Sequence, residues 1–529
     1  ASETIIGTSK DDYIDYDGGD DYVNGKEGND TLLFNHDYTS AFEVLTIAGI
    51  TKIRVGSSAS EDYAYDDVKI INVESVKFNN TYLSLDTALP TESIIWGTTD
   101  SETLMGTNTD DLLDSAGGND IINGDEGNDT LVIFSNSNYF DIQTISGITK
   151  FYGSTQVSYD TFSTKYFYSG YQSRMINVES IQFLDKTLTL DTTPITESIL
   201  WGTANADILI GTDDDDLIDS AGGNDLIDGK DGMDALVIFS KKDDFSSLGE
   251  IMTIGGITKM LTNSFYSGIG YEYYNYVITM INVEKVQFND QSLNLDTMLI
   301  SESNIFGTSG SDILIGTDDN DLIDSAGDND YIDGKGGDDT LAIFDNNIGF
   351  EILTVAGITK IKSYINNNIG FSYSDSTITM INVENITYEN TSIVIETILP
   401  ASNFINGSIQ SESLVGSADN DLFDSFGGND EIDGRTGTDT LALFGNQADF
   451  EVITLSGLTK IYGLNSDGLA GNYWGNTIKM IEVESITFAD QSISIETTYS
   501  GNLIAWGSTS GTTIDGTDGN DVIDSGGGS

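Results

Sequence analysis

The segment Gly97–Val132 decides the fold, because it divides into four blocks of nine residues: GTTDSETLM, GTNTDDLLD, SAGGNDIIN and GDEGNDTLV. Each block has an acid at its sixth place, from Glu102 to Asp129, and an aliphatic residue at its eighth. Gly, Asn and Asp tolerate the positive φ angles of tight turns, so the first six residues turn the chain. The other three form a short strand whose middle side chain points inward. The pattern predicts a parallel β-roll in which two turn-plus-strand units make one coil.

A longer period contains these blocks. The segment Ser115–Asp120 recurs at residues 220–225, 325–330 and 425–430, with a diverged copy at 16–21 and a partial copy from Ser525. We therefore expect an all-β fold of tandem parallel β-rolls that alternate with small antiparallel β domains. The predicted repeats are 1–90 (roll 2–33, β domain 34–90), 91–195 (roll 97–132, β domain 133–195), 196–300 (roll 202–237, β domain 238–300), 301–400 (roll 307–342, β domain 343–400), 401–500 (roll 407–442, β domain 443–500) and a partial roll at 501–529.

The second half of each repeat has the alternation of antiparallel strands. In the second repeat an apolar strand at 131–134 is followed by a hairpin signal at 145–150, an alternating segment Met175–Phe183 and a last strand at 187–190. Period-two alternation with Thr, Val, Ile and Phe predicts antiparallel pairs, and no segment predicts a helix. Because the expected linkers are short, as at Thr91–Ile95 and Thr196–Ile199, the repeats are expected to form a stiff rod.

The acids in register predict a metal site. Stacked turns bring Asp side chains and carbonyl oxygens of neighbouring turns together, and such an oxygen cage suits Ca²⁺ rather than Zn²⁺. Without cations the stacked carboxylates would repel one another. The predicted Ca²⁺ ligands are Asp12, Asp21, Asp30, Asp111, Asp120, Asp129, Asp207, Asp216, Asp225, Asp234, Asp312, Asp321, Asp330, Asp339, Asp421, Asp430, Asp439 and Asp521.

These blocks resemble the RTX (haemolysin-type) calcium-binding nonapeptide, GGxGxDxUx. The resemblance implies Ca²⁺ between successive turns, with the sixth-place Asp as the main side-chain ligand. It also implies disorder without calcium and folding outside the cell. Some blocks depart from the pattern: Gly211-Thr212 and Gly416-Ser417 lack the first Gly pair, and Glu102, Glu412 and Thr512 replace the Asp. We expect those edge sites to be weak or empty.

The second half of each repeat resembles the NVExxxFxDxT strand pair that accompanies RTX rolls. Its Glu recurs five times, as Glu74, Glu179, Glu284, Glu384 and Glu484. A catalytic residue need not occur five times, so we expect this Glu to make a fixed hydrogen bond or salt bridge to the neighbouring roll.

Composition narrows the class of partner. The formal net charge is −65, from 21 basic and 86 acidic residues, which excludes a nucleic-acid partner. Aromatic residues make up 10% of the chain, too many for a disordered acidic tail. No apolar stretch predicts membrane insertion, and without cysteine there is no disulfide. Adaptation to high salt would also explain the acidity, but the fixed register of the Asp residues favours metal binding.

The motifs of common enzymes are missing. His36 is the single histidine, and no HExxH, GxSxG, P-loop or dinucleotide motif occurs. We therefore expect no enzymatic activity. A polysaccharide-active enzyme with paired acids is the least favoured alternative.

The favoured function is a secreted, extracellular or cell-surface structural protein of a filament, surface layer or matrix, folded and bridged by Ca²⁺. The chain starts and stops inside nonapeptides, so the tail of one copy is expected to complete a roll at the head of the next. The equally favoured alternative is that the sequence is one part of a longer repetitive protein. The alternative function is an adhesin stalk or a module that binds cell-surface glycans. It would use the aromatic stretches Tyr159–Tyr171, Tyr266–Tyr276 and Asn472–Trp474, unless these fill the cores of the β domains.

Overall fold

The computed structural model describes most of the chain. The described residues are 3–39, 42–55, 67–89, 93–153, 170–191, 198–242, 251–263, 274–299, 303–344, 349–364, 376–388, 391–399, 403–498, 503–507 and 513–525. Three short 3-10 segments lie within these ranges: η1 (Ser137–Tyr139), η3 (Gln447–Asp449) and η4 (Ala470–Tyr473). No helix in this part of the chain is long and apolar enough to cross a membrane.

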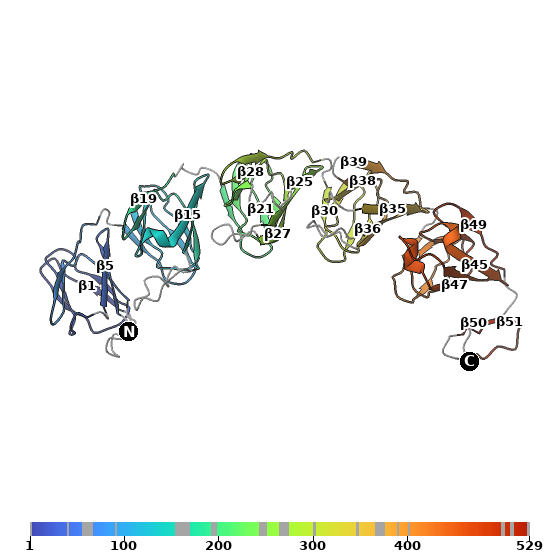
Figure 1. The fold of residues 1–529 in the computed structure, drawn as a ribbon, viewed down its shortest axis with the longest axis horizontal. Coiled ribbons are helices and arrows are strands. Elements are labelled where there is room, and N and C mark those ends of the chain that lie inside the picture. Colours follow the sequence, from blue (N-terminus) through green and yellow to red (C-terminus); the bar gives the residue numbers. More distant parts are fainter. Residues whose placement is uncertain are drawn as a thin grey trace. The chain divides into compact units, whose positions relative to one another are not determined.

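The second repeat shows the architecture: two five-stranded sheets that the chain visits in alternation (Figure 1). One sheet has the order β10 (Ser93–Trp96), β12 (Asp111–Asp114), β14 (Thr130–Ile133), β18 (Ser180–Phe183) and β19 (Thr187–Thr189). The other has the order β11 (Thr103–Met105), β13 (Ile121–Asn123), β17 (Gln172–Ile176), β16 (Ile148–Gly153) and β15 (Phe140–Ile145). We call them the even and the odd sheet.

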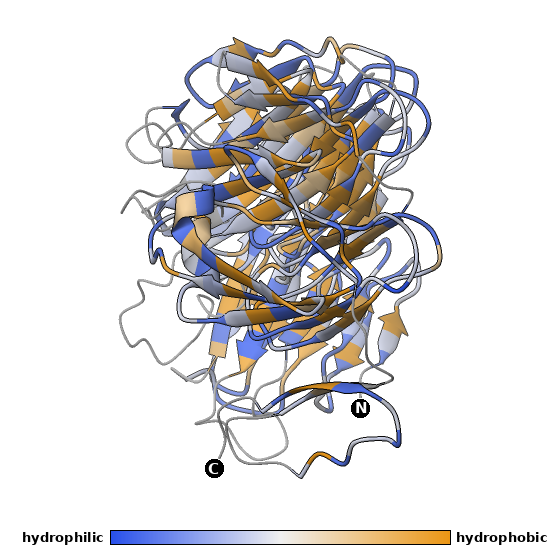
Figure 2. Ribbon diagram, turned by 90° about the vertical axis from the view of Figure 1, so that its right-hand side faces the viewer, coloured by the Kyte–Doolittle hydropathy of each residue, from blue (hydrophilic) through white to orange (hydrophobic). Residues whose placement is uncertain are grey.

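The core lies between these two sheets. Leu113 and Leu131 of the even sheet and Ile122 of the odd sheet are fully buried, as the eighth-place rule predicts. Parallel pairing places Ile122 beside Leu104 and Leu113 beside Leu131. The strands carry most of the hydrophobic residues, whereas the turns between them are largely hydrophilic (Figure 2). The all-β fold with tandem parallel rolls is therefore confirmed.

The predicted antiparallel half is continuous with the roll. β17 pairs in parallel with β13, and β18 pairs in parallel with β14, so Met175–Phe183 forms one more coil. The hairpin β15–β16 is inserted before this coil, and its strand β16 pairs antiparallel with β17. Antiparallel β19 completes the even sheet. Alternation could not distinguish these pairings, because a strand with one buried face alternates whichever way its neighbour runs.

The predicted linkers hold the first strand of the next roll. Ser93–Trp96 forms β10 and Ser198–Trp201 forms β20, each pairing in parallel with the strand eighteen residues later. The rolls therefore start one strand earlier than Gly97 and Gly202. The nine-residue pattern did not predict these strands, because Ser93 and Ser198 stand where the following blocks have the sixth-place acid.

The hairpin signals are confirmed. Ser146 and Gly147 have φ angles of 50° and 81° between β15 and β16, the geometry of a type I′ turn. The same turn joins β45 to β46 through Ser456 and Gly457.

The other repeats contain the corresponding strands. The first has β1 (Thr4–Ile6), β2 (Tyr13–Asp15), β3 (Tyr22–Asn24), β4 (Thr31–Leu33), β5 (Phe42–Ile47), β6 (Ile50–Val55), β7 (Asp67–Ile71), β8 (Ser75–Lys77) and β9 (Tyr82–Ser84). The third has β20 (Ser198–Trp201), β21 (Ile208–Ile210), β22 (Asp216–Asp219), β23 (Leu226–Asp228), β24 (Ala235–Ile238), β25 (Ile251–Ile254), β26 (Ile257–Asn263), β27 (Tyr274–Ile281), β28 (Lys285–Phe288) and β29 (Ser292–Asn294). The fourth has β30 (Ser303–Phe306), β31 (Ile313–Ile315), β32 (Asp321–Asp324), β33 (Tyr331–Asp333), β34 (Thr340–Ile343), β35 (Gly349–Val355), β36 (Ile358–Tyr364), β37 (Thr377–Ile381), β38 (Asn385–Tyr388) and β39 (Thr391–Val394). The fifth has β40 (Asn403–Asn406), β41 (Ser413–Val415), β42 (Asp421–Asp424), β43 (Glu431–Asp433), β44 (Thr440–Ala442), β45 (Phe450–Leu455), β46 (Leu458–Gly463), β47 (Thr477–Ile481), β48 (Ser485–Thr487) and β49 (Ser492–Ser494), and β50 (Leu503–Trp506) and β51 (Asp521–Asp524) follow.

The chain forms two compact units. The first comprises residues 1–250 and 260–296, and the second comprises 251–259 and 297–529. In the first unit, the hairpin of one repeat packs on the outer face of the next roll, where Ile47 and Ile50 meet Leu112, Val132 and Phe134. The second unit repeats this contact, with Val355 and Ile358 in one cluster with Leu422 and Phe444.

Each hairpin also inserts a lysine into the following roll. Lys52 Nζ lies 2.6 Å from Asp114 Oδ2 and 4.6 Å from the centre of the Phe134 ring, and both charged side chains are at most 1% exposed. The corresponding pairs are Lys150–Asp219, Lys259–Asp324, Lys360–Asp424 and Lys460–Asp524. We call these the junction pairs. In each pair the lysine comes from one repeat and the aspartate from the following roll, so each buried charge is neutralised only by the neighbouring repeat.

Candidate calcium-binding turns

The turns lie in two stacks at the two ends of each roll. In the second repeat one stack holds the turns 97–102 and 115–120, which lead from the even to the odd sheet. The other stack holds the turns 106–111 and 124–129, which lead back. Each turn ends on the sixth-place acid of its block, so the acids of one stack lie one above the other.

One carboxylate oxygen of the inner Asp binds the coil before it. The backbone N–H of Asp111 donates to Oδ1 of Asp129 at 2.7 Å, and that of Glu102 donates to Oδ1 of Asp120 at 3.1 Å. The third repeat has the same bonds, from Asp216 to Asp234 and from Asp207 to Asp225. The backbone thereby fixes the position of the carboxylate.

The second oxygen of these carboxylates is buried without a hydrogen-bond partner. This holds for Oδ2 of Asp30, Asp120, Asp129, Asp225, Asp234, Asp330, Asp339, Asp430 and Asp439. An unpaired buried carboxylate is strongly unfavourable unless a cation compensates it. The orphaned oxygens therefore fit a bound cation, and the side chains present can hold Ca²⁺.

The pKa values of these carboxyl groups are raised, because burial disfavours the charged form when no cation is bound. Burial raises the pKa from 3.8 to about 7 for Asp120, Asp129, Asp225, Asp234, Asp330 and Asp339. It raises the pKa to about 6 for Asp430 and Asp439. Desolvation is the largest cause in each case, and neighbouring acids add to it. A divalent cation would reverse the preference for the protonated form.

Backbone oxygens converge on the same places. A Cβ atom on Gly124 would lie under 3.0 Å from both the carbonyl oxygen of Asn177 and Oδ2 of Asp129. A Cβ atom on Gly106 would meet the carbonyl of Gly124 and Oδ2 of Asp111 in the same way. Glycine at these positions lets carbonyl and carboxylate oxygens approach each other. Among the described residues no three His, Cys, Asp or Glu side chains cluster as a metal site, so most ligands would be backbone oxygens, which suits Ca²⁺.

The turns fall into two classes, set by the second residue of the block. In the first class this residue is Thr or Ser, and it binds one oxygen of the acid of its own turn: Thr107 donates to Asp111 Oδ2 from its N–H at 2.6 Å and from its hydroxyl at 3.0 Å. The other oxygen, Oδ1, of Asp111 and of Asp216 is buried without a hydrogen-bond partner. We call these closed turns. The pairs are Thr8–Asp12, Thr98–Glu102, Thr107–Asp111, Thr203–Asp207, Thr212–Asp216, Thr308–Asp312, Thr317–Asp321, Ser408–Glu412, Ser417–Asp421 and Thr517–Asp521.

In the second class the second residue is left-handed, and we call these open turns. Ala116 and Asp125 have φ angles of 57° and 70°. The open turns carry such a residue throughout, namely Lys26, Ala116, Asp125, Ala221, Lys230, Ala326, Lys335, Phe426 and Arg435. These nine turns are the ones whose Asp has an orphaned Oδ2. The first-repeat turn that ends at Asp21 belongs to neither class.

The predicted ligands are thus not equivalent. Fourteen of them are buried, whereas Asp12, Asp207, Asp312 and Asp521 are partly exposed. The sixth-place rule found every open-turn Asp with an orphaned Oδ2 but did not separate open from closed turns. Thr or Ser at the second place of the block is the sequence signal that separates them.

The recurrent Glu makes its predicted fixed hydrogen bond, to the last turn of its own repeat. The backbone N–H of Asp129 donates to Glu179 Oε2 at 2.6 Å. This bond is equivalent to the one that the N–H of Asp111 donates to the carboxylate of Asp129. The bond recurs at Glu74, Glu284, Glu384 and Glu484. The sequence did not reveal that this Glu continues the stack of sixth-place acids.

A protein-family model of the RTX calcium-binding nonapeptide repeat (4 copies) matches residues 1–32, 96–131, 201–236, 306–341, 406–441 and 506–529. The chain carries RTX calcium-binding repeats. No curated protein matches it. Among solved structures, the extracellular lipase LipA from Serratia marcescens is similar at 10% identity with a TM-score of 0.12. The match covers 56% of this chain and 39% of the lipase chain. The matched segments coincide with the rolls of the successive repeats.

Proposed function

We propose that the chain is a secreted structural protein that Ca²⁺ folds and stiffens into an extracellular filament, surface layer or matrix. The observation that carries the proposal is the set of orphaned Asp carboxylates in the open turns. The junction pairs support it, because they tie each roll to the hairpin of the repeat before it. The described residues serve rolls and junctions, and we propose no catalytic role for the chain.

The proposed partners are copies of the same chain. A heterologous contact between copies that does not close builds a filament or lattice, and shared Ca²⁺ can bridge the copies in it.

Binding of cell-surface glycans is the second candidate, and a single aromatic residue favours it. Trp474 is 63% exposed, whereas its neighbour Tyr473 is 2% exposed and packs against Phe450 in the core. Residues 159–169 and 266–273 of the other aromatic stretches lie outside the described residues.

Circular dichroism and electron microscopy of the chain in EGTA and then in millimolar Ca²⁺ test the proposal. We expect Ca²⁺ to convert a disordered chain into β-structure and ordered filaments or sheets. A chain that folds with Ca²⁺ but stays monomeric would favour the glycan-binding function. A chain that is fully folded and unchanged in EGTA would contradict the role of the turns.

A further inference from the structure

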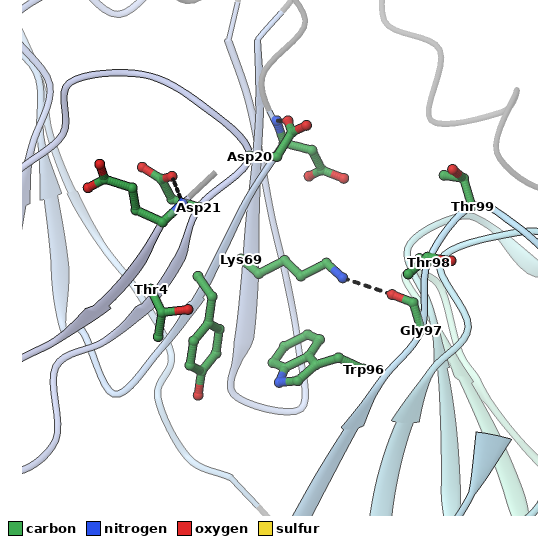
Figure 3. A pocket seen from close by; sticks show the side chains of 12 residues that line it. Thr4, Asp20, Asp21, Lys69, Trp96, Gly97, Thr98 and Thr99 are labelled. Atoms are coloured by element: carbon green, nitrogen blue, oxygen red, sulfur yellow. Dashed lines mark hydrogen bonds between the residues drawn. The ribbon is translucent and has the colours of Figure 1, made fainter. Parts of the chain in front are cut away.

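At three junctions a basic side chain of one repeat reaches the first glycine of the next roll. Lys69 Nζ donates to the carbonyl oxygen of Gly97 at 3.0 Å and lies 5.2 Å from the centre of the Trp96 ring (Figure 3). The same arrangement joins Arg174 to Gly202 and Trp201, and Lys479 to Gly507 and Trp506. Each site combines a carbonyl oxygen with an aromatic face, and both attract a cation.

The register shows which residue holds this position at the junction of the fourth and fifth repeats. Lys69 lies opposite Tyr22, the first residue of β3, and Thr379 lies opposite Tyr331, the first residue of β33. The tryptophan position is filled by Asn406, which pairs with Asp424 as Trp96 pairs with Asp114. This junction therefore has neither the cation nor the tryptophan.

A cleft of about 420 Å³ takes their place. Its lining includes Asp312, Asp330, Tyr331, Thr379, Gly407 and Phe426, and it contains no Lys or Arg among the described residues. Thr379 is 1% exposed, and its hydroxyl oxygen has no hydrogen-bond partner. Asp330 also lines the cleft, but its orphaned Oδ2 belongs to the proposed calcium site.

Compared with the first junction, this cleft has one basic side chain fewer. Lys360 is the counterpart of Lys52 and is paired with Asp424 at 2.7 Å, so it is engaged in the junction pair. Glu412 is bound by Ser408, and Asp312 by Thr308. Thr379 has a neutral hydroxyl at the position where Lys69 lies in the first junction. The acidic residues of the neighbouring turns are nevertheless still present.

We propose that this cleft binds a primary ammonium or guanidinium group. The group would donate to the Gly407 carbonyl and the Thr379 hydroxyl beside Asp312, as Lys69 donates to Gly97. Tyr331 provides an aromatic wall that suits an organic cation. A metal ion would instead seek six to eight oxygens, roughly. The group can come from a free amine or from a basic side chain of a partner protein.

Calorimetric titration of the full chain in millimolar Ca²⁺ tests the site, with n-butylammonium, methylguanidinium and a blocked Gly-Lys-Gly peptide as probes. We expect saturable binding of the cations and none of 1-butanol, which has a similar shape without charge. Binding of the peptide as well as the free amine assigns the site to a partner's side chain, whereas binding of the amine alone assigns it to a small molecule. No binding of any cation, or equal binding of 1-butanol, would overturn the proposal.

A variant that rebuilds the first junction distinguishes this site from general attraction to an acidic protein. Thr379→Lys with Asn406→Trp should fill the cleft, lower the affinity for n-butylammonium about tenfold or more, and raise the melting temperature. Thr391→Lys adds the same charge at an exposed position and should leave binding unchanged. Undiminished binding by the double variant would place the probe elsewhere. This outcome does not depend on filament formation, so the two proposals fail separately.

Discussion

At the scale of the residue, the second position of each nonapeptide determines the state of its acid. A Thr such as Thr107 donates two hydrogen bonds to the carboxylate of its own turn, whereas left-handed Asp125 turns its N–H to Asn123 and leaves Asp129 Oδ2 without a donor. Calcium binding therefore depends on the partner of the acid as well as on the acid.

Two isosteric substitutions in the third repeat test this difference. Asp225→Asn should remove one bound Ca²⁺ per chain, because it removes the charge at an orphaned oxygen. Asp207→Asn is the matched control and should leave the stoichiometry unchanged, because Thr203 already binds Asp207 Oδ2. Metal analysis after equilibrium dialysis measures both. Equal losses in the two variants would show that the closed turns bind Ca²⁺ too.

The raised pKa values of the open-turn carboxyls predict how pH acts. In the calcium-free fold these groups have pKa values of about 7, against 3.8 ordinarily, so between these values the fold binds more protons than the unfolded chain. Stability without calcium should therefore be present at acidic pH and be lost as the pH rises through about 7. Calcium must displace those protons, so its affinity should rise over the same range.

Scanning calorimetry of metal-depleted and calcium-loaded protein at pH 5 and pH 8 measures this effect. We expect metal-depleted protein to melt cooperatively at pH 5 but to show no melting transition at pH 8. Ca²⁺ should raise the melting temperature little at pH 5 and should produce a melting transition at pH 8. An equal gain at the two pH values would mean that the buried carboxyls do not hold the ion.

At the scale of the element, the sequence predicted where most strands lie but not which strands pair with each other. The nine-residue period located β11 to β14, because acid, turn and inward aliphatic residue recur in step. It missed β10, which has no acid before it, and the coil of β17 and β18, which the inserted hairpin β15–β16 separates from the other blocks. Parallel pairing over such a separation depends on the whole roll and not on a local pattern.

The junction pairs were also invisible in the sequence, because Lys52 and Asp114 belong to different repeats. Lys52→Met should lower the free energy of unfolding of the junction between the first and second repeats by about 3–5 kcal/mol. The reason is that Asp114 would stay buried without its cationic partner. Lys52→Met with Asp114→Leu should recover much of the loss. Hydrogen exchange of β6 and β12 in Ca²⁺ measures both variants.

Lys10→Met is the control for lost positive charge, because Lys10 is exposed. It should leave the exchange rates in β6 and β12 unchanged. A Lys52→Met variant that exchanges as slowly as the native chain would show that the junction pair contributes nothing to stability.

At the scale of the whole molecule, the negative charge destabilises the folded state until cations bind. The formal net charge is −65, and the open turns bury part of that charge where water cannot compensate it. Ligands that bind the folded state alone stabilise it by mass action, so Ca²⁺ at many sites can drive folding of the entire chain.

This reasoning separates specific calcium binding from adaptation to high salt, which would also explain an acidic chain. Monovalent salt screens exposed charges, but it does not supply ligands to a buried Asp oxygen. Small-angle scattering should therefore give a radius of gyration near the unfolded value, about 86 Å for this length, in EGTA with or without 0.5 M (roughly) NaCl. Millimolar Ca²⁺ should reduce it sharply. Mg²⁺ should act weakly, because it gives up its water reluctantly and demands an octahedral site. Compaction by NaCl alone would make the acidity a response to salt and leave the orphaned carboxylates without their proposed ion.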